Sequence, residues 1–328
     1  MGLPSKPFPP PPSPLFQILL MGWLSLLASP SFGASDYKAR FEVPWQKRDF
    51  PAMAQVLREW RTARPKDLEL LVAYGDYFYS KGGQELEPLE GSLTVGGILL
   101  KKKPPRSLSG LVSPAVPRNL ELLRQAGPCW KAALRSHPWR LDISLNLAFL
   151  YQALGDFEAQ YAILADALQY ADKHRSRLKW EREEGLPLAS KTLLPEILQD
   201  FAGRYLLRER SSETEQAFRL ARLNETFYPD YLETYNVMAA YFHFKKDGPF
   251  TLRCLLMAYE KNPKDSVILL NIANVLLGLR KKEPAVIFFR KVVELDNDRE
   301  CVSRARKKLK KLGKTTINRR NAEAAEKT

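Results

Sequence analysis

The chain contains little histidine and cysteine, which restricts the metal and thiol chemistry open to it. Only three histidines occur, and no two of them have the spacing of a metal-binding pair. The three cysteines, Cys129, Cys254 and Cys301, lie far apart in the sequence. We therefore expect free thiols packed within helices rather than disulfides.

Sequence motifs for catalysis are missing as well. There is no glycine loop that would cradle a phosphate, no zinc-binding His-Glu-x-x-His helix and no nucleophile elbow. The acidic cluster of Glu181, Glu183 and Glu184 lies among lysines and arginines, a pattern typical of a solvated face. We therefore expect a protein that is not an enzyme and that binds neither a cofactor nor a metal ion.

Long apolar runs are also missing: the chain contains no stretch of 20 apolar residues, the length that a helix needs to span a bilayer. The main apolar run is shorter, at residues 15–28, and it follows Lys6 and precedes the small residues Ser31, Gly33 and Ala34. This pattern predicts a secretory signal peptide at about residues 1–34, and hence a periplasmic or membrane-associated protein of a bacterial cell envelope. An uncleaved anchor and a misassigned start codon, which would leave a cytoplasmic regulator, are the alternatives.

A rhythm of 34 residues is the clearest positive signal in the sequence. Pro229, Pro263 and Asn297 follow one another at this interval, and so do residues 217, 251 and 285. A period of this length predicts a solenoid of helix hairpins, because a single hairpin cannot bury its own apolar face. We therefore expect stacked hairpins that offer a long binding surface.

The hairpins can be read from residues 142–171. Leu147, Ala148 and Tyr151 share one face of a first helix, a turn follows at residues 155–157, and Ala167 and Leu168 lie on a second helix. Small residues at such positions let two helices approach to about 8–10 Å. A larger side chain at Ala148 should therefore force the hairpin open.

The chain resembles the tetratricopeptide repeat family, whose pattern places Leu-Gly or Leu-Ala and Tyr on a first helix, and Ala, an aromatic residue and Pro on a second. Further copies carry Tyr74-Gly75 with Trp130, and Met238-Ala239 with Pro263. Gln160 and Thr251 stand where Ala is usual, Asn224 replaces a small apolar residue, and Pro44 should interrupt the first helix of the first copy.

The resemblance implies an all-α solenoid of antiparallel hairpins in a right-handed superhelix. We expect about five or six repeats over residues 36–298, with one long insertion loop at about residues 82–117. A basic capping helix should cover residues 299–313 and end at Gly313, and a disordered tail should cover residues 314–328.

The insertion lies between Gly75 and Ala126, which are separated by about 39 residues more than a regular hairpin needs. It contains the apolar run 93–100 with Gly96-Gly97 at its centre, a pattern that can form a two-residue β-hairpin. Because an isolated hairpin is marginal in water, it would need support from the solenoid wall. The insertion either grips a partner or an acidic surface, or folds against the array to cover a damaged hairpin.

Positive charge gathers in two segments of the chain. Residues 299–328 carry +8 of the net charge of +14, and a second cluster follows the apolar run of the insertion. The candidates for a basic surface are Lys101, Lys102, Lys103, Arg306, Lys307, Lys308, Lys310 and Lys311. This charge either keeps a capping helix soluble or attracts an anionic membrane or cell-wall polymer; the lack of interleaved aromatic residues argues against nucleic acid.

The resemblance implies that the first helices of the hairpins line a groove that binds an extended peptide or a partner helix. The groove candidates are Asp76, Tyr79, Phe149, Gln152, Asn236, His243, Asn271 and Asn274. Asparagine suits this role because its amide offers both a donor and an acceptor to a peptide backbone. Some family members hold two carboxylates with a clamp of Lys, Asn and Arg, but Asn236 and Leu270 stand where that clamp needs Lys.

Together these patterns predict a scaffold that mediates contacts between proteins in the cell envelope. A protein that binds a membrane surface or an anionic polymer through its basic segments is the first alternative. A cytoplasmic regulator is the second.

Overall fold

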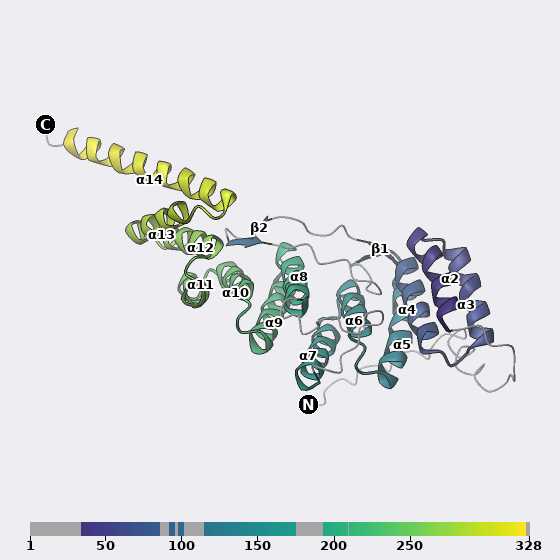
Figure 1. The fold of residues 1–328 in the computed structure, drawn as a ribbon. Helices are drawn as coiled ribbons and strands as arrows, with labels where there is room; N and C mark the ends of the chain where they lie inside the picture. Colours follow the sequence, from purple (N-terminus) through teal and green to yellow (C-terminus); the bar gives the residue numbers. More distant parts are fainter. Residues whose placement is uncertain are drawn as a thin grey trace, which may run out of the picture. The chain divides into compact units, whose positions relative to one another are not determined.

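The computed structural model describes residues 34–85, 92–95, 98–101, 115–174, 193–208 and 210–325. The predicted signal peptide lies outside these residues, apart from its last position. The chain forms two compact units, the first made of residues 1–84 and 117–136, the second of residues 85–116 and 137–328. In the described part of the chain, thirteen helices and four short strands are present, so the predicted helical fold is confirmed (Figure 1).

The first unit contains two pairs of helices. They are α2 (Ala34–Lys47), α3 (Phe50–Ala63), α4 (Leu68–Gly82) and α5 (Leu120–Ser136). Helix α2 packs against α3, and α4 packs against α5. Because α2 continues through Pro44, the expected interruption there is wrong. Pro44 removes the one intrahelical bond that its N–H would donate, and the helix ends three residues later at Lys47.

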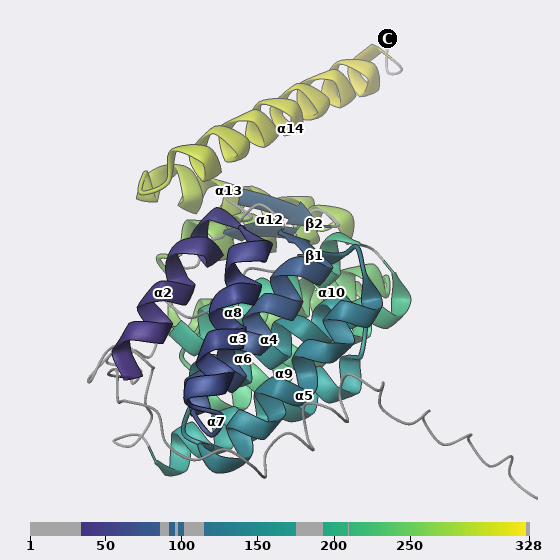
Figure 2. The same ribbon diagram turned by 90° about the vertical axis from the view of Figure 1, so that its right-hand side faces the viewer.

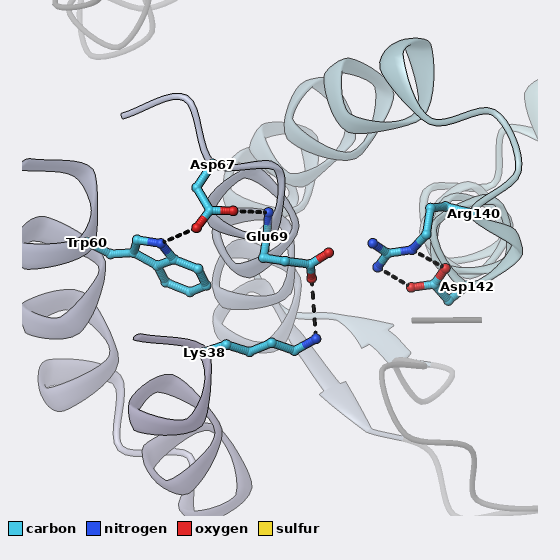
Figure 3. A network of polar contacts seen from close by, with 6 residues as sticks. All are labelled: Lys38, Trp60, Asp67, Glu69, Arg140 and Asp142. Carbon is cyan, nitrogen blue, oxygen red and sulfur yellow. Dashed lines mark hydrogen bonds and ion pairs between the residues drawn. The ribbon is translucent and has the colours of Figure 1, made fainter. Parts of the chain in front are cut away.

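Asp67 shows how a local sequence feature starts a helix in the first unit. One carboxylate oxygen accepts a hydrogen bond from the backbone N–H of Glu69 at 3.0 Å and caps α4. The other accepts from the indole Nε1 of Trp60 at 2.9 Å, which ties the cap to a fully buried ring (Figure 3). Asp67 therefore fixes α4 against α3.

The second unit is a row of helix hairpins. Its helices are α6 (Leu141–Leu154), α7 (Phe157–Lys173), α8 (Leu193–Leu207), α9 (Ser211–Phe227), α10 (Glu233–Phe244), α11 (Gly248–Lys261), α12 (Ser266–Gly278), α13 (Lys282–Leu295) and α14 (Arg299–Ala325). Each even-numbered helix from α6 to α12 packs against its successor, and successive pairs are joined by contacts of α7 with α9, α9 with α10, α11 with α12 and α13 with α14. The predicted solenoid of hairpins is thus confirmed.

The turn between α6 and α7 follows the sequence prediction. Gly155 ends α6 in the left-handed conformation, with a φ of 71°. Asp156 then caps α7 by accepting a hydrogen bond from the N–H of Ala159 at 3.1 Å. Asp247 and Asp265 cap α11 and α12 in the same way, so the repeated aspartates mark where helices begin.

Small residues hold the helices of each hairpin close together, as expected. Ala148, Ala239 and Ala273 have no exposed surface, and each lies on the first helix of its pair. Because interiors are packed at the density of organic crystals, a larger side chain at these positions has no space to enter.

The insertion contributes the four strands. Strands β1 (Gly83–Glu85) and β4 (Ala115–Pro117) pair with each other, and β2 (Ser92–Val95) pairs with β3 (Ile98–Lys101). The second pair is antiparallel, with Val95 opposite Ile98 and Ser92 opposite Lys101, which confirms the predicted hairpin. Strand β3 lies against α10 and α12, so the helices supply the support that the hairpin needs (Figures 1 and 2).

Helix α14 begins where the sequence predicted a capping helix. Cys301, Val302 and Ala305 are buried, and the helix packs against α13 and α12. It continues through Gly313 to Ala325, so the predicted helix end at Gly313 and the disordered tail that should follow are wrong for residues 314–325. A glycine in a helix costs only about 1 kcal/mol, which the rest of the helix offsets.

None of the described helices is both long enough and apolar enough to cross a bilayer.

Candidate peptide-binding face and pocket

A single asparagine side chain holds strand β3 against the helices of the second unit. The Oδ1 atom of Asn271 accepts a hydrogen bond from the N–H of Leu99 at 2.8 Å, and its Nδ2 donates to the carbonyl oxygen of Leu99 at 2.9 Å. Asn271 is completely buried, and Leu99 is 1% exposed. The amide therefore reads the peptide backbone with a donor and an acceptor at once, the chemistry expected of an asparagine on this face.

Asn236 on α10 orients that amide. The Nδ2 of Asn271 donates its other hydrogen to Oδ1 of Asn236 at 3.0 Å, so both N–H groups are used. Asn236 is 4% exposed, and the pair is therefore shielded from water. We name Asn236 and Asn271, with the parts of α10 and α12 that contact β3, the strand face.

The strand face binds the edge of β3 that points away from β2. In an antiparallel pair, opposite residues either exchange both backbone hydrogen bonds or exchange neither. Because the N–H and the C=O of Leu99 are both bonded to Asn271, Leu99 and its opposite residue Thr94 exchange no backbone hydrogen bonds. The side-chain amide of Asn271 thus stands where a third strand would pair.

A pocket of about 760 Å³ lies beside the strand face. Its apolar lining comes from Leu270, Val275 and Leu279 together with Ile98 of β3, and its polar lining includes His243 and Asn274. Cationic residues complete the lining: Lys246, Arg304, Lys307, Lys308 and Lys311. No Asp or Glu occurs among the described residues that line it, and we name this site the basic pocket.

Local structure explains why Lys246 reaches the basic pocket and Lys245 does not. Lys246 has a φ of 59° and follows the C-terminal end of α10, where its N–H bonds to the carbonyl oxygen of His243. Lys245 instead forms a hydrogen-bonded ion pair with Glu215, and its hydrogen bond lowers the pKa of the Glu215 carboxyl. On α14, Arg304 pairs with Glu300 at 2.7 Å along the exposed surface of the helix.

The predicted groove residues fall into two groups. Asn236 and Asn271 form the strand face, and His243 and Asn274 line the basic pocket. The other four are buried elsewhere: Asp76, Tyr79, Phe149 and Gln152. Tyr79 packs on Trp130 with ring centroids 5.6 Å apart, and Phe149 packs on Phe201 at 4.8 Å. Other parts of the chain cover these four side chains, and their role in a groove stays a prediction.

The predicted basic residues are divided as well. Lys307, Lys308 and Lys311 line the basic pocket, whereas Arg306 and Lys310 are exposed on α14 and do not line it. Lys101 ends strand β3, and Lys102 and Lys103 lie outside the described residues.

Sequence reasoning missed Lys246 and Arg304 as lining residues and did not find what occupies the strand face. One signal could have indicated part of the pocket. Asn274 and Lys308 are one 34-residue period apart, so they take equivalent positions on successive first helices. The contact between Leu99 and Asn271 joins residues 172 positions apart and leaves no such periodic signal.

Comparison with known proteins gives one family match and several similar folds. Residues 267–299 match the family model described as tetratricopeptide repeat, and no curated protein matches the chain. The TPR2AB domain of yeast Sti1 in its pHSP90 complex is 15% identical, with a TM-score of 0.28, over 84% of this chain and 95% of that one. A tetratricopeptide repeat protein from Parabacteroides merdae is 14% identical, with a TM-score of 0.30, over 84% and 97%.

The TPR domain of P58(IPK) is 14% identical, with a TM-score of 0.31, over 86% of this chain and 66% of that one. The matched residues 267–299 cover α12 and α13, and the hairpins before them repeat the same pairing of helices. Residues 267–299 therefore form a tetratricopeptide repeat, and the hairpins before them have the helix pairing of the same kind of repeat.

Proposed function

We propose that the protein is a non-catalytic scaffold that binds an acidic, extended segment of a partner protein in the basic pocket. The observation that carries this proposal is the composition of the pocket lining. Five cationic side chains surround an apolar base, and no carboxylate occurs among the described lining residues. Such a site favours a ligand that carries both negative charge and an apolar side chain.

The size of the basic pocket supports a peptide as the ligand. A volume of about 760 Å³ lies in the range of sites that enclose small ligands, and it suits a few side chains rather than a folded domain. Asn274 can bond a peptide N–H or C=O in the way that Asn271 bonds Leu99.

The basic pocket also supplies cations near the positions where the lysines of a two-carboxylate clamp are missing. Lysine is missing at Asn236 and Leu270, where a clamp for two carboxylates would need it. Arg304 and Lys308 on α14 lie on the same pocket as Asn274 and provide positive charge from the following helix. We propose that carboxylates of the partner bind there by charge-assisted hydrogen bonds.

A binding measurement with matched charge changes tests this function. The probe is a fluorescein-labelled peptide of four Glu and two Leu, compared by fluorescence polarisation with the same peptide carrying Gln for Glu. We expect Lys307→Glu/Lys308→Glu to weaken binding of the acidic probe at least tenfold. The control Arg306→Glu/Lys310→Glu makes the same charge change on exposed residues outside the pocket and should alter affinity less than threefold.

The same variants separate peptide binding from attraction to an anionic surface. If equal losses followed from both double variants, binding would depend on the total charge of α14 and the pocket would have no role. Vesicles containing an anionic lipid then become the relevant probe, because attraction of the protein to such a surface weakens as its positive charge is reduced and as salt is added.

We also propose that the scaffold acts in the cell envelope after export. The support is the sequence of residues 15–28, whose apolar run between Lys6 and the small residues near Ala34 is typical of a signal peptide. N-terminal sequencing of the mature protein from cell fractions tests this. Cytoplasmic protein that retains its first residues would contradict export.

A further inference from the structure

We infer that β3 is a tethered occupant of the strand face, which competes there with an extended apolar strand supplied by a partner protein. This inference rests on the proposed role of the chain as a scaffold for other proteins. It adds a second site to the basic pocket and a control on access to that site.

The contact between Asn271 and β3 uses backbone atoms alone. Asn271 binds the N–H and the C=O of Leu99, two groups that every residue except proline presents in the same way. A strand from another protein can therefore replace β3 without losing either hydrogen bond. Selectivity comes from the apolar surroundings, because Ile98 and Leu99 are each 1% exposed.

The edge geometry identifies the ligand class. Asn271 bonds the edge of β3 that points away from β2. An added strand from a second chain pairs with the same kind of edge when it extends a sheet. The ligand that fits is an extended segment with at least two consecutive apolar residues and a free backbone edge. Ile98 also lines the basic pocket, so a strand that replaced β3 would lie next to the proposed acidic site.

The tether gives β3 an advantage over any free strand. A segment that belongs to the same chain as its site acts there at an effective concentration on the order of 1 mM. If β3 leaves the strand face open in about one molecule in ten, the apparent affinity for a free strand falls about tenfold. Weakening β3 should therefore increase the affinity for a free strand.

The full-length chain provides the test. The probe is a fluorescein-labelled synthetic peptide with the sequence of residues 92–101, titrated by fluorescence polarisation. Leu99→Pro removes the N–H that donates to Asn271 but none that pairs with β2, so we expect it to tighten probe binding about tenfold. Adding Asn271→Leu to that variant removes the amide that receives the probe and should abolish the gain.

A matched control uses the same strand edge. Lys101→Pro places the same ring two residues further along β3, on the side away from β2 but beyond Asn271, and should change affinity less than twofold. An unchanged affinity of Leu99→Pro, or a gain that survives Asn271→Leu, would overturn the inference. So would a gain that appears only with a dimer in light scattering, because strands would then exchange between copies.

Hydrogen exchange of the unaltered chain tests the same point if Leu99→Pro does not fold. Excess probe should speed exchange at the amide of Leu99, because displaced β3 loses its bond to Asn271. Unchanged protection at a probe concentration that saturates binding would show that β3 does not leave. The proposed function is judged separately, by the acidic probe and the lysines of α14.

Discussion

The hydroxyl of Tyr205 donates a 2.7 Å hydrogen bond to the Oε1 atom of Gln160, joining helices α8 and α7 inside the second unit. Both side chains are completely buried. The Nε2 of Gln160 donates to the carbonyl oxygen of Ala148 at 3.2 Å, and the Nε2 of Gln216 lies 3.4 Å from the same Oε1. Gln160 thus links four helices at a position where the repeat pattern has alanine.

Replacing Gln160 by that usual alanine should destabilise the protein. Gln160→Ala leaves the buried hydroxyl of Tyr205 without its acceptor and opens a cavity, so we expect a loss of about 3 kcal/mol in the free energy of unfolding. Tyr205→Phe removes only the donor and should cost about 1 kcal/mol. Urea unfolding followed by circular dichroism measures both. A loss below about 0.5 kcal/mol for Gln160→Ala would contradict the structural role.

The hairpins could be predicted because their signals are local. Gly155 and Asp156 form a turn through their own backbone and side-chain chemistry, and Ala148 is small because its helix partner follows within 20 residues. Gln160 seemed only to depart from the pattern. Its partners Tyr205 and Gln216 are 45 and 56 residues away, and no local rule connects them.

The candidate site was predictable to the extent that it depends on residue chemistry. Asn271 was predicted to line a groove for a partner peptide because of its amide, and in the structure this amide bonds the backbone of Leu99 in the same chain. Its binding of a partner stays a prediction. That the peptide belongs to the insertion is a tertiary fact that periodicity cannot supply. The ring contacts of Tyr79 and Phe149 could not be predicted, because helical spacing identifies a face but not the helix that covers it.

A buried ion pair at the start of α6 should be sensitive to the loss of one charge. The guanidinium of Arg140 binds both carboxylate oxygens of Asp142 at 2.9 and 2.6 Å, and both residues are at least 94% buried (Figure 3). Asp142→Asn replaces the carboxylate that binds two guanidinium nitrogens of a buried arginine by a neutral amide, so we expect a loss of about 3–5 kcal/mol in the free energy of unfolding.

The control for this ion pair is Glu158→Gln, which removes the carboxylate that Arg219 binds on the exposed surface. We expect it to leave the urea midpoint nearly unchanged, because solvent screens exposed ion pairs. Equal shifts of the midpoint in Asp142→Asn and Glu158→Gln would show that burial of the first pair has no energetic effect.

The thiol of Cys254 should be unreactive at neutral pH. Burial raises its pKa to about 11, so the thiolate fraction at pH 8 is roughly a hundredfold smaller than for an ordinary thiol. Alkylation by iodoacetamide, followed by mass spectrometry of the peptide containing Cys254, should accelerate about tenfold per pH unit up to about pH 11. A rate that levels off near pH 9 would contradict the raised pKa.

The same shift predicts how stability changes with pH. The folded state keeps the thiol of Cys254 protonated where the unfolded chain releases its proton, and the folded state therefore binds more protons above the unfolded pKa of about 8.5. The contribution of Cys254 is complete below that pH and is lost as the pH rises toward 11. As the pH rises from about 8.5 to 11, the urea midpoint of Cys254→Ala should therefore fall less than that of the unaltered chain.

Gly75 on α4 should tolerate no side chain, although it lies within a helix. A Cβ atom there would lie 2.2 Å from Nε1 and 2.4 Å from Cδ1 of Trp130, a completely buried ring on α5. The ring is rigid and its surroundings are packed, so Gly75→Ala must push α4 and α5 apart. We expect a loss of about 1–3 kcal/mol in the free energy of unfolding, and a shift in tryptophan fluorescence as Trp130 moves.

The matched control is Gly313→Ala, where the same substitution in α14 meets nothing within 4 Å. Alanine restricts the unfolded chain and favours the helix, so this variant should gain about 0.5–1 kcal/mol in helix stability. Because the gain requires that α14 continue through residue 313, the control also tests the helix that replaces the predicted tail. Destabilisation by Gly313→Ala would show that the helix ends there, and a neutral Gly75→Ala would show that Trp130 yields to the added methyl group.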